Sequence, residues 1–201
     1  MKSRKQIAWR AKPQRSTETI PFIPWLQDRG SLTTQLQARG KFAVRLLRQG
    51  IGTPTRDEAA ALGVKPKRVA WVREAALHCD GKPLVFAHTI LPYRPRGPMT
   101  GWLARLGNRS LGALLFSHTG FKRGQLECKR LDHRQALFQP AINAMQLLAT
   151  PPANLWARRS RFVFGTQTVL VTEVFSPALR FDSHPEKVPK KINRCCALKS
   201  V

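Results

Sequence analysis

The chain has 201 residues, enough for one globular domain whose core needs neither a disulfide nor a metal. Its 35 Lys and Arg against 11 Asp and Glu give a formal net charge of +24, which predicts long-range attraction for anions and says nothing about the fold. No stretch approaches the length of a transmembrane helix, and the basic N-terminus lacks the apolar run of a secretory signal. We therefore expect a cytoplasmic protein without a transmembrane segment.

The cysteines argue against a metal site. Cys79, Cys128, Cys195 and Cys196 form no CxxC pair and have no ligand-like spacing to the histidines, so zinc is not expected and the thiols should be reduced.

Composition predicts one folded domain with a flexible segment at each end. Residues 1–23 are polar and basic, and residues 182–201 combine prolines with a basic cluster, so both are expected to be flexible. The domain itself should span residues 24–181.

The first predicted elements follow from caps and turn residues. Ser31 is a plausible N-cap for a short helix that ends before Gly40, and Thr55 caps another over residues 55–62. Between them, residues 41–53 read as a strand. The pair Asp80-Gly81 then predicts a tight hairpin between two strands that flank it.

Later segments complete an α+β pattern. Residues 98–107 and 110–116 read as short helices, residues 120–131 as a strand, and a second hairpin turns at residues 165–167. The strands then number six, which suggests a single six-stranded antiparallel sheet with helices packed on one face. We expect residues 132–154 to be an insertion, either a surface helix interrupted near Pro140 or a lid over the pocket.

Two charged residues stand on apolar strand faces. In VLVTEVF, Glu173 shares a face with Val169, Val171 and Phe175, and in VAWVREAAL, Arg73 joins an equally apolar row. Buried charges are rare unless they are paired. An ion pair inside the sheet and a functional site are both consistent with this pattern.

The motifs around these charges favour a site. WVRE at 71–74, SLGALLF at 110–116, LWARRSRF at 155–162 and VLVTEVFSP at 169–177 occur in this order. In this the chain resembles bacterial chorismate lyase from about Pro24 to Pro177. The resemblance implies a carbon-oxygen lyase without a cofactor that converts chorismate to 4-hydroxybenzoate and pyruvate, at the entrance to ubiquinone biosynthesis.

The resemblance also implies the site residues. Arg73 matches the arginine that binds the ring carboxylate, and Glu173 matches the glutamate that faces the ring hydroxyl. Leu32 and Leu111 fall where the family uses backbone N–H groups, although the family usually has methionine at the first of these positions. Each follows a serine at a predicted helix start, where N–H groups lack intrahelical partners and the dipole is positive.

Three points stay open at this stage. Glu173 could position the ring or transfer a proton. His88, on the face of Leu84 and Phe86, is either a core histidine or the partner of the second substrate carboxylate, at a position where arginine is expected in many family members. The arginines of WARRSRF, at positions 158, 159 and 161, could line a solvated face or guide a dianionic substrate.

Two other classes of function compete with the enzyme. A nucleic-acid binder would fit the charge, but neither a basic stripe with exposed aromatics nor a recognition helix is visible. A non-catalytic module that binds small carboxylates would share the fold, as do effector domains of some bacterial regulators. We expect a monomer that acts on chorismate and does not bind nucleic acid.

Overall fold

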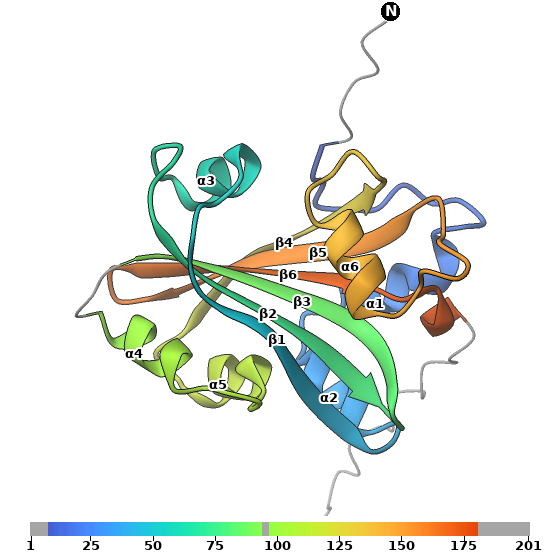
Figure 1. The fold of residues 1–201 in the computed structure, drawn as a ribbon, viewed down its shortest axis with the longest axis horizontal. Coiled ribbons are helices and arrows are strands. Elements are labelled where there is room, and N and C mark those ends of the chain that lie inside the picture. Colours follow the sequence, from blue (N-terminus) through green and yellow to red (C-terminus); the bar gives the residue numbers. More distant parts are fainter. Residues whose placement is uncertain (1–7, 94–96, 181–201) are drawn as a thin grey trace, which may run out of the picture.

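The sheet is the centre of the molecule. The computed structural model describes residues 8–93 and 97–180, and it contains one six-stranded antiparallel sheet in the order β1-β2-β3-β6-β5-β4 (Figure 1). The strands are β1 (Phe42–Gly52), β2 (Ala70–Cys79), β3 (Lys82–Pro92), β4 (Lys122–Leu131), β5 (Leu155–Phe164) and β6 (Gln167–Phe175). The expected α+β class and the six-stranded antiparallel sheet are confirmed.

Two hairpins form the middle of this sheet. Asp80 and Gly81 have φ angles of 49° and 76°, as the tight turn between β2 and β3 requires. The second hairpin, between β5 and β6, turns at Gly165, whose φ is also positive. Strand β6 pairs with β3, so the two hairpins lie side by side and their central strands are covered on both edges.

Helices cover both faces of the sheet, whereas the sequence predicted helices on one face. One face, here called the pocket face, carries α1 (Ile23–Gln27), α2 (Leu32–Gln37), α4 (Pro98–Ala104) and α5 (Leu111–Ser117). The opposite face, here called the far face, carries α3 (Arg56–Leu62) and α6 (Phe138–Ala144). The reason lies in the central strands: the neighbouring residues Val85 and Phe86 point to opposite faces and both are fully buried, so each face needs a cover.

Segment 132–154 contributes to the core of the far face. Phe138, Ile142 and Met145 pack in one cluster with Phe86 of β3 and Val174 of β6. Pro140 is tolerated because it lies in the first turn of α6, where no intrahelical hydrogen bond is lost. Of the two expectations, the structure shows the surface helix, since α6 lies on the face opposite to the pocket described below.

The segment before α1 lies against the sheet. Arg10 exchanges two backbone hydrogen bonds with Cys128 at the outer edge of β4, and Trp9 stacks over Arg159 of β5. A 3₁₀ helix, η1 (Ile20–Phe22), leads into α1, and a second, η2 (Pro177–Arg180), follows β6. The basic end expected to be flexible, residues 182–201, lies outside the described residues.

Candidate active site

A pocket lies between the pocket face of the sheet and the first turns of α2 and α5. Its lining brings together Leu32, Arg73, Leu111 and Glu173, which come from α2, β2, α5 and β6. Its cavity volume is about 40 Å³.

Arg73 is a buried cation without a carboxylate partner in the part of the chain that the structure describes. Only 2% of the residue is exposed, and its Nη2 donates to the carbonyl oxygens of Gly107 and Arg109, each at 3.0 Å. Its Nε has no hydrogen-bond partner among the described residues, and burial lowers the pKa of the guanidinium. The alternative of a direct Arg73–Glu173 ion pair is not what the structure shows, so a free positive charge is available to an anionic ligand.

Glu173 has a different partner, Arg158. The guanidinium Nε of Arg158 donates to the Glu173 carboxylate at 2.5 Å, across the β5–β6 ladder in which the two residues are directly opposite. Arg158 is fully buried and also donates to the carbonyl oxygens of Trp25 and Asp28. One carboxylate oxygen of Glu173 is thus fixed, and the residue still lines the pocket.

The starts of α2 and α5 meet beside the pocket. Ser31 and Ser110 cap these helices by accepting hydrogen bonds from the N–H groups of Thr34 and Ala113. The hydroxyl groups of Thr33 and Ser110 are 2.6 Å apart, which ties the two helix starts together. A Cβ atom at Gly112 would lie 2.6 Å from the Thr33 hydroxyl oxygen, so only glycine permits this approach. The first N–H groups of both helices therefore lie close to one another.

Arg123 is a pocket residue that sequence reasoning missed. It comes from β4, donates through Nε to the Ser160 hydroxyl and through Nη1 to the Arg29 carbonyl oxygen, and lies 5.3 Å from the Phe116 ring. Burial, with the nearby Arg158 charge as the next cause, lowers its pKa to about 10. Its strand contains a register shift next to this residue, so alternation gave no signal.

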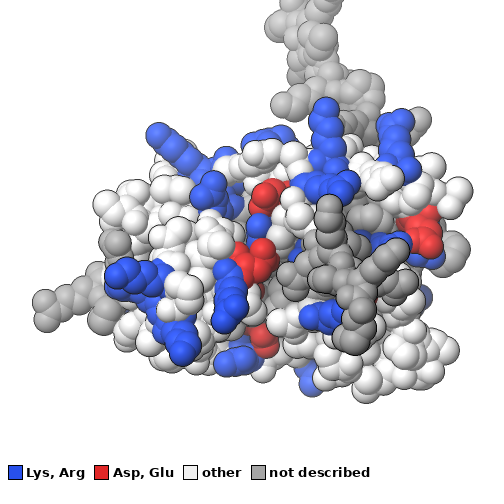
Figure 2. Space-filling model, turned by 90° about the horizontal axis from the view of Figure 1, so that it is seen from above, with Lys and Arg blue, Asp and Glu red and all other residues white. Residues whose placement is uncertain are grey.

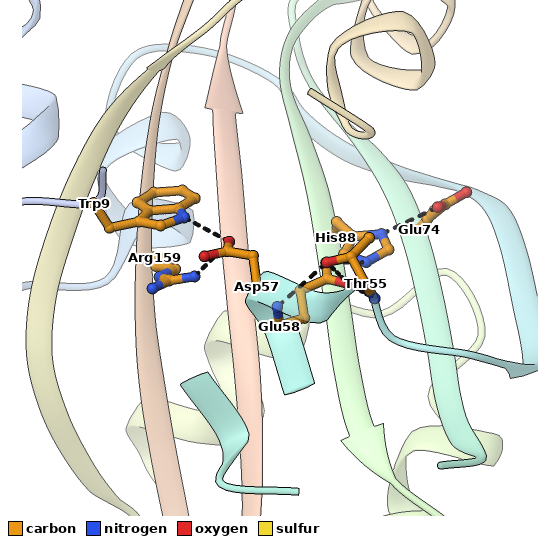
Figure 3. Close-up of polar contacts among 7 residues, drawn as sticks. All are labelled: Trp9, Thr55, Asp57, Glu58, Glu74, His88 and Arg159. Carbon is orange, nitrogen blue, oxygen red and sulfur yellow. Dashed lines mark hydrogen bonds and ion pairs between the residues drawn. The ribbon is translucent and has the colours of Figure 1, made fainter. Parts of the chain in front are cut away.

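His88 is not among the residues that line this pocket. It points to the far face, where Glu58 of α3 and Glu74 of β2 each lie 3.0 Å from one of its ring nitrogens (Figure 3). Burial alone would lower its pKa, but the hydrogen bonds and charges of Glu58 and Glu74 raise it to about 9. Its surroundings are therefore those of a paired core histidine, the first of the two alternatives considered above.

This cluster gives stability that depends on pH. Because the folded-state pKa of His88, about 9, lies above the ordinary value of 6.5, its contribution is complete below pH 6.5 and is lost as pH rises through 9. The free energy of unfolding should therefore fall by up to about 3 kcal/mol over this window. Urea unfolding at a series of pH values measures this. His88→Gln should flatten the profile; a slope equal to that of the wild type would contradict the assignment.

Arg159 also belongs to the far face, and it is buried. Its guanidinium donates to Asp57 at 2.9 Å, under the ring of Trp9, whose indole N–H donates to the same Asp57 carboxylate (Figure 3). It also donates to Glu127 at 2.8 Å. Of the three arginines of WARRSRF, only Arg161 is exposed. The sequence could not separate these three environments, because the partners come from distant segments.

The described residues include no group of three or more His, Cys, Asp and Glu side chains that could hold a metal ion. They also include no helix long and apolar enough to cross a bilayer.

Solved structures of similar fold are transcription regulators. A GntR family regulator from Bacillus cereus matches with a TM-score of 0.50 and 14% identity, over 69% of this chain and 94% of that one. PhnF from Mycobacterium smegmatis matches with a TM-score of 0.51 and 19% identity, over 75% of this chain and 65% of that one. At these identities the likeness concerns the fold alone.

Comparisons of the sequence identify the family more closely than the fold does. A family model described as chorismate lyase matches residues 4–184. A probable chorismate pyruvate-lyase of Dechloromonas aromatica is 50% identical over 77% of this chain and 86% of its own length. Another, of Nitrosomonas europaea, is 40% identical over 90% of this chain and 99% of its own length. The chain therefore belongs to the chorismate lyase family.

Proposed function

We propose that this protein is a chorismate pyruvate-lyase, a carbon-oxygen lyase that forms 4-hydroxybenzoate for ubiquinone biosynthesis. The observation that carries the proposal is the convergence of Arg73, Glu173 and two helix starts on one pocket, in a chain that belongs to this family. A cytoplasmic, monomeric enzyme remains our prediction.

Arg73 would hold the ring carboxylate at one end of the pocket. Its guanidinium lacks an internal carboxylate partner among the described residues, and its Nε–H is free to donate. The backbone N–H groups of Leu32 and Leu111, at the starts of α2 and α5, would complete the contact. Because these donors belong to the backbone, leucine in place of methionine at position 32 should affect packing more than binding.

Glu173 would accept the hydrogen bond of the ring hydroxyl at the other end. The ion pair with Arg158 fixes the orientation of its carboxylate, as a group that positions a ring requires. In the reaction the hydrogen on the hydroxyl-bearing carbon leaves as a proton, the neighbouring carbon-oxygen bond breaks, and the enolate that departs takes up a proton to give pyruvate. The ring becomes aromatic, so positioning and stabilisation of the enolate supply much of the catalysis.

The leaving group carries the second carboxylate of chorismate, and Arg123 is its best partner. The enolpyruvyl group is attached to the ring carbon next to the one that bears the hydroxyl, so this carboxylate should lie near Glu173. Arg123 lines the pocket close enough to Glu173 for their charges to interact. His88, the residue first considered for this role, points to the far face.

The role of Arg123 can be separated from that of Arg73 because 4-hydroxybenzoate lacks the second carboxylate. Arg123→Met should raise KM for chorismate about ten-fold, the effect of one charge-assisted contact, and should leave the affinity for 4-hydroxybenzoate within about two-fold. Steady-state kinetics and calorimetric titration measure the two quantities. An equal loss of substrate and product affinity would place Arg123 elsewhere.

A direct assay tests the proposed function. Purified protein incubated with chorismate should release 4-hydroxybenzoate and pyruvate in equal amounts. Chromatography measures the 4-hydroxybenzoate, and a coupled enzymatic assay measures the pyruvate. Binding of 4-hydroxybenzoate without turnover, over a range of pH and salt, would instead identify a module that binds small carboxylates.

A further inference from the structure

The chain has an excess of Lys and Arg over Asp and Glu, and most carboxylates of the described residues are already paired with one of its own cations. Of the carboxylates in the described residues, all but two form ion pairs with arginine or histidine, and Asp28 and Asp80 accept backbone N–H bonds. Figure 2 shows most acidic side chains of the far face near its middle, with Lys and Arg side chains around them. A cationic surface remains that the reaction of one small dianion does not require.

Exposed apolar side chains accompany these cations at one end of the sheet. Ile51 of β1 is 51% exposed and Val69, just before β2, is 47% exposed. Because Ile51 is opposite Trp71 and Val69 precedes Trp71 by two residues, both side chains point to the same face and are diagonal neighbours. They do not contribute to the buried core clusters.

Cations follow one another in the turn beside this apolar pair. Lys65, Lys67 and Arg68 are exposed in the turn that leads directly into Val69. We name the set Ile51, Lys65, Lys67, Arg68 and Val69 the β1–β2 patch.

We propose that the β1–β2 patch docks the protein on an anionic lipid bilayer. Lys and Arg side chains are attracted to the negative surface of such a membrane, and each one near the surface adds to the affinity. Ile51 and Val69 enter the boundary between headgroups and acyl chains, which stabilises binding by removing apolar area from water. The cations and the two aliphatic side chains together give a reversible contact with the membrane surface.

A bilayer explains the patch better than a nucleic acid does. Phosphodiester backbones would satisfy the cations, but single-stranded nucleic acids are held by exposed aromatic rings and duplexes by base contacts from a helix or ribbon. The patch instead places aliphatic side chains among the cations. Neither Ile51 nor Val69 lines the catalytic pocket, so docking leaves the pocket residues in place.

The test is cosedimentation with vesicles of phosphatidylcholine, with and without phosphatidylglycerol, at physiological ionic strength. The wild type should bind the vesicles that contain phosphatidylglycerol and should not bind those of phosphatidylcholine only. The double variant Ile51→Ser/Val69→Ser should bind them at least about ten-fold more weakly. Its matched control is Ile20→Ser/Leu148→Ser, which removes two other exposed apolar side chains, 57% and 63% exposed, and should bind like the wild type. Circular dichroism and turnover of chorismate verify that each variant is folded.

Two outcomes would overturn the proposal. Equal binding by the wild type and both double variants would mean that net charge alone causes adsorption. Tighter binding to an RNA or DNA oligonucleotide than to anionic vesicles, unaffected by Ile51→Ser/Val69→Ser, would assign the cations to nucleic acid. Either result leaves the lyase assay unaffected, so the two proposals are tested separately.

Discussion

Replacing Arg73 with alanine should weaken binding of 4-hydroxybenzoate by about 2 to 4 kcal/mol, or about 30- to 1,000-fold in Kd. The reason is that the buried guanidinium has no carboxylate partner among the described residues and supplies the main charge to the ligand. Arg73→Lys should restore only part of the affinity, since an ammonium lacks the fork that grips both carboxylate oxygens. Calorimetric titration gives these values directly.

A change of ligand controls for the structural role of Arg73, which also holds the loop carbonyls of Gly107 and Arg109. The amide analogue, 4-hydroxybenzamide, lacks the negative charge and should bind the wild type weakly. In Arg73→Ala the acid and the amide should bind about equally, because the charge contact that favours the acid in the wild type is gone. A variant that still prefers the acid by the wild-type factor would exclude Arg73 from the carboxylate contact.

Replacing Glu173 with alanine should lower kcat/KM for chorismate about 100-fold, because the ring hydroxyl loses a charged acceptor and Arg158 loses its partner. Glu173→Gln then separates positioning from proton transfer. An amide can still accept the hydroxyl hydrogen bond, so positioning predicts a kcat within about ten-fold of the wild type. General acid or base work predicts a loss in kcat of about 100-fold or more.

Glu127 offers a matched control for the ion pair itself. It accepts from Arg159 on the far face at 2.8 Å, much as Glu173 accepts from Arg158 on the pocket face. Glu127→Gln should therefore lower the melting temperature to a similar or smaller extent and leave kcat unchanged. Full activity in folded Glu173→Ala would remove Glu173 from the site and leave only its structural role with Arg158.

The sequence was sufficient for those parts of the molecule that depend on local patterns. The strands around Asp80 and Gly165 and the caps at Ser31, Thr55 and Ser110 all follow from residues within a few positions of each other. Arg73 and Glu173 were identified as inward charges by alternation alone, and they line the same pocket.

What the sequence could not predict depends on contacts between distant segments. Alternation places Arg73 and Glu173 on inner faces, but the structure partners Glu173 with Arg158 and partners Arg73 with the carbonyls of the α4–α5 loop. The sequence predicted helices at residues 55–62 and near Pro140 but not that they cover the far face: the mostly apolar run in β3 indicates two covered faces, yet it does not say which helix covers each one. Arg123 gave no signal because the register of β4 shifts between Arg123, which pairs with Phe162, and Leu126, which pairs with Ser160.

The two networks on opposite faces of strand β5 limit where residues can be inserted into or deleted from the chain. Arg158 serves the pocket face and its neighbour Arg159 serves the far face, where Trp9, Asp57 and Glu127 hold it. Inserting or deleting one codon before these two would exchange their faces and misplace both networks at once. Tolerated length variation should therefore be found in the hairpin turn at Gly165 and in the connection that follows α6, where added residues leave the register of β5 intact.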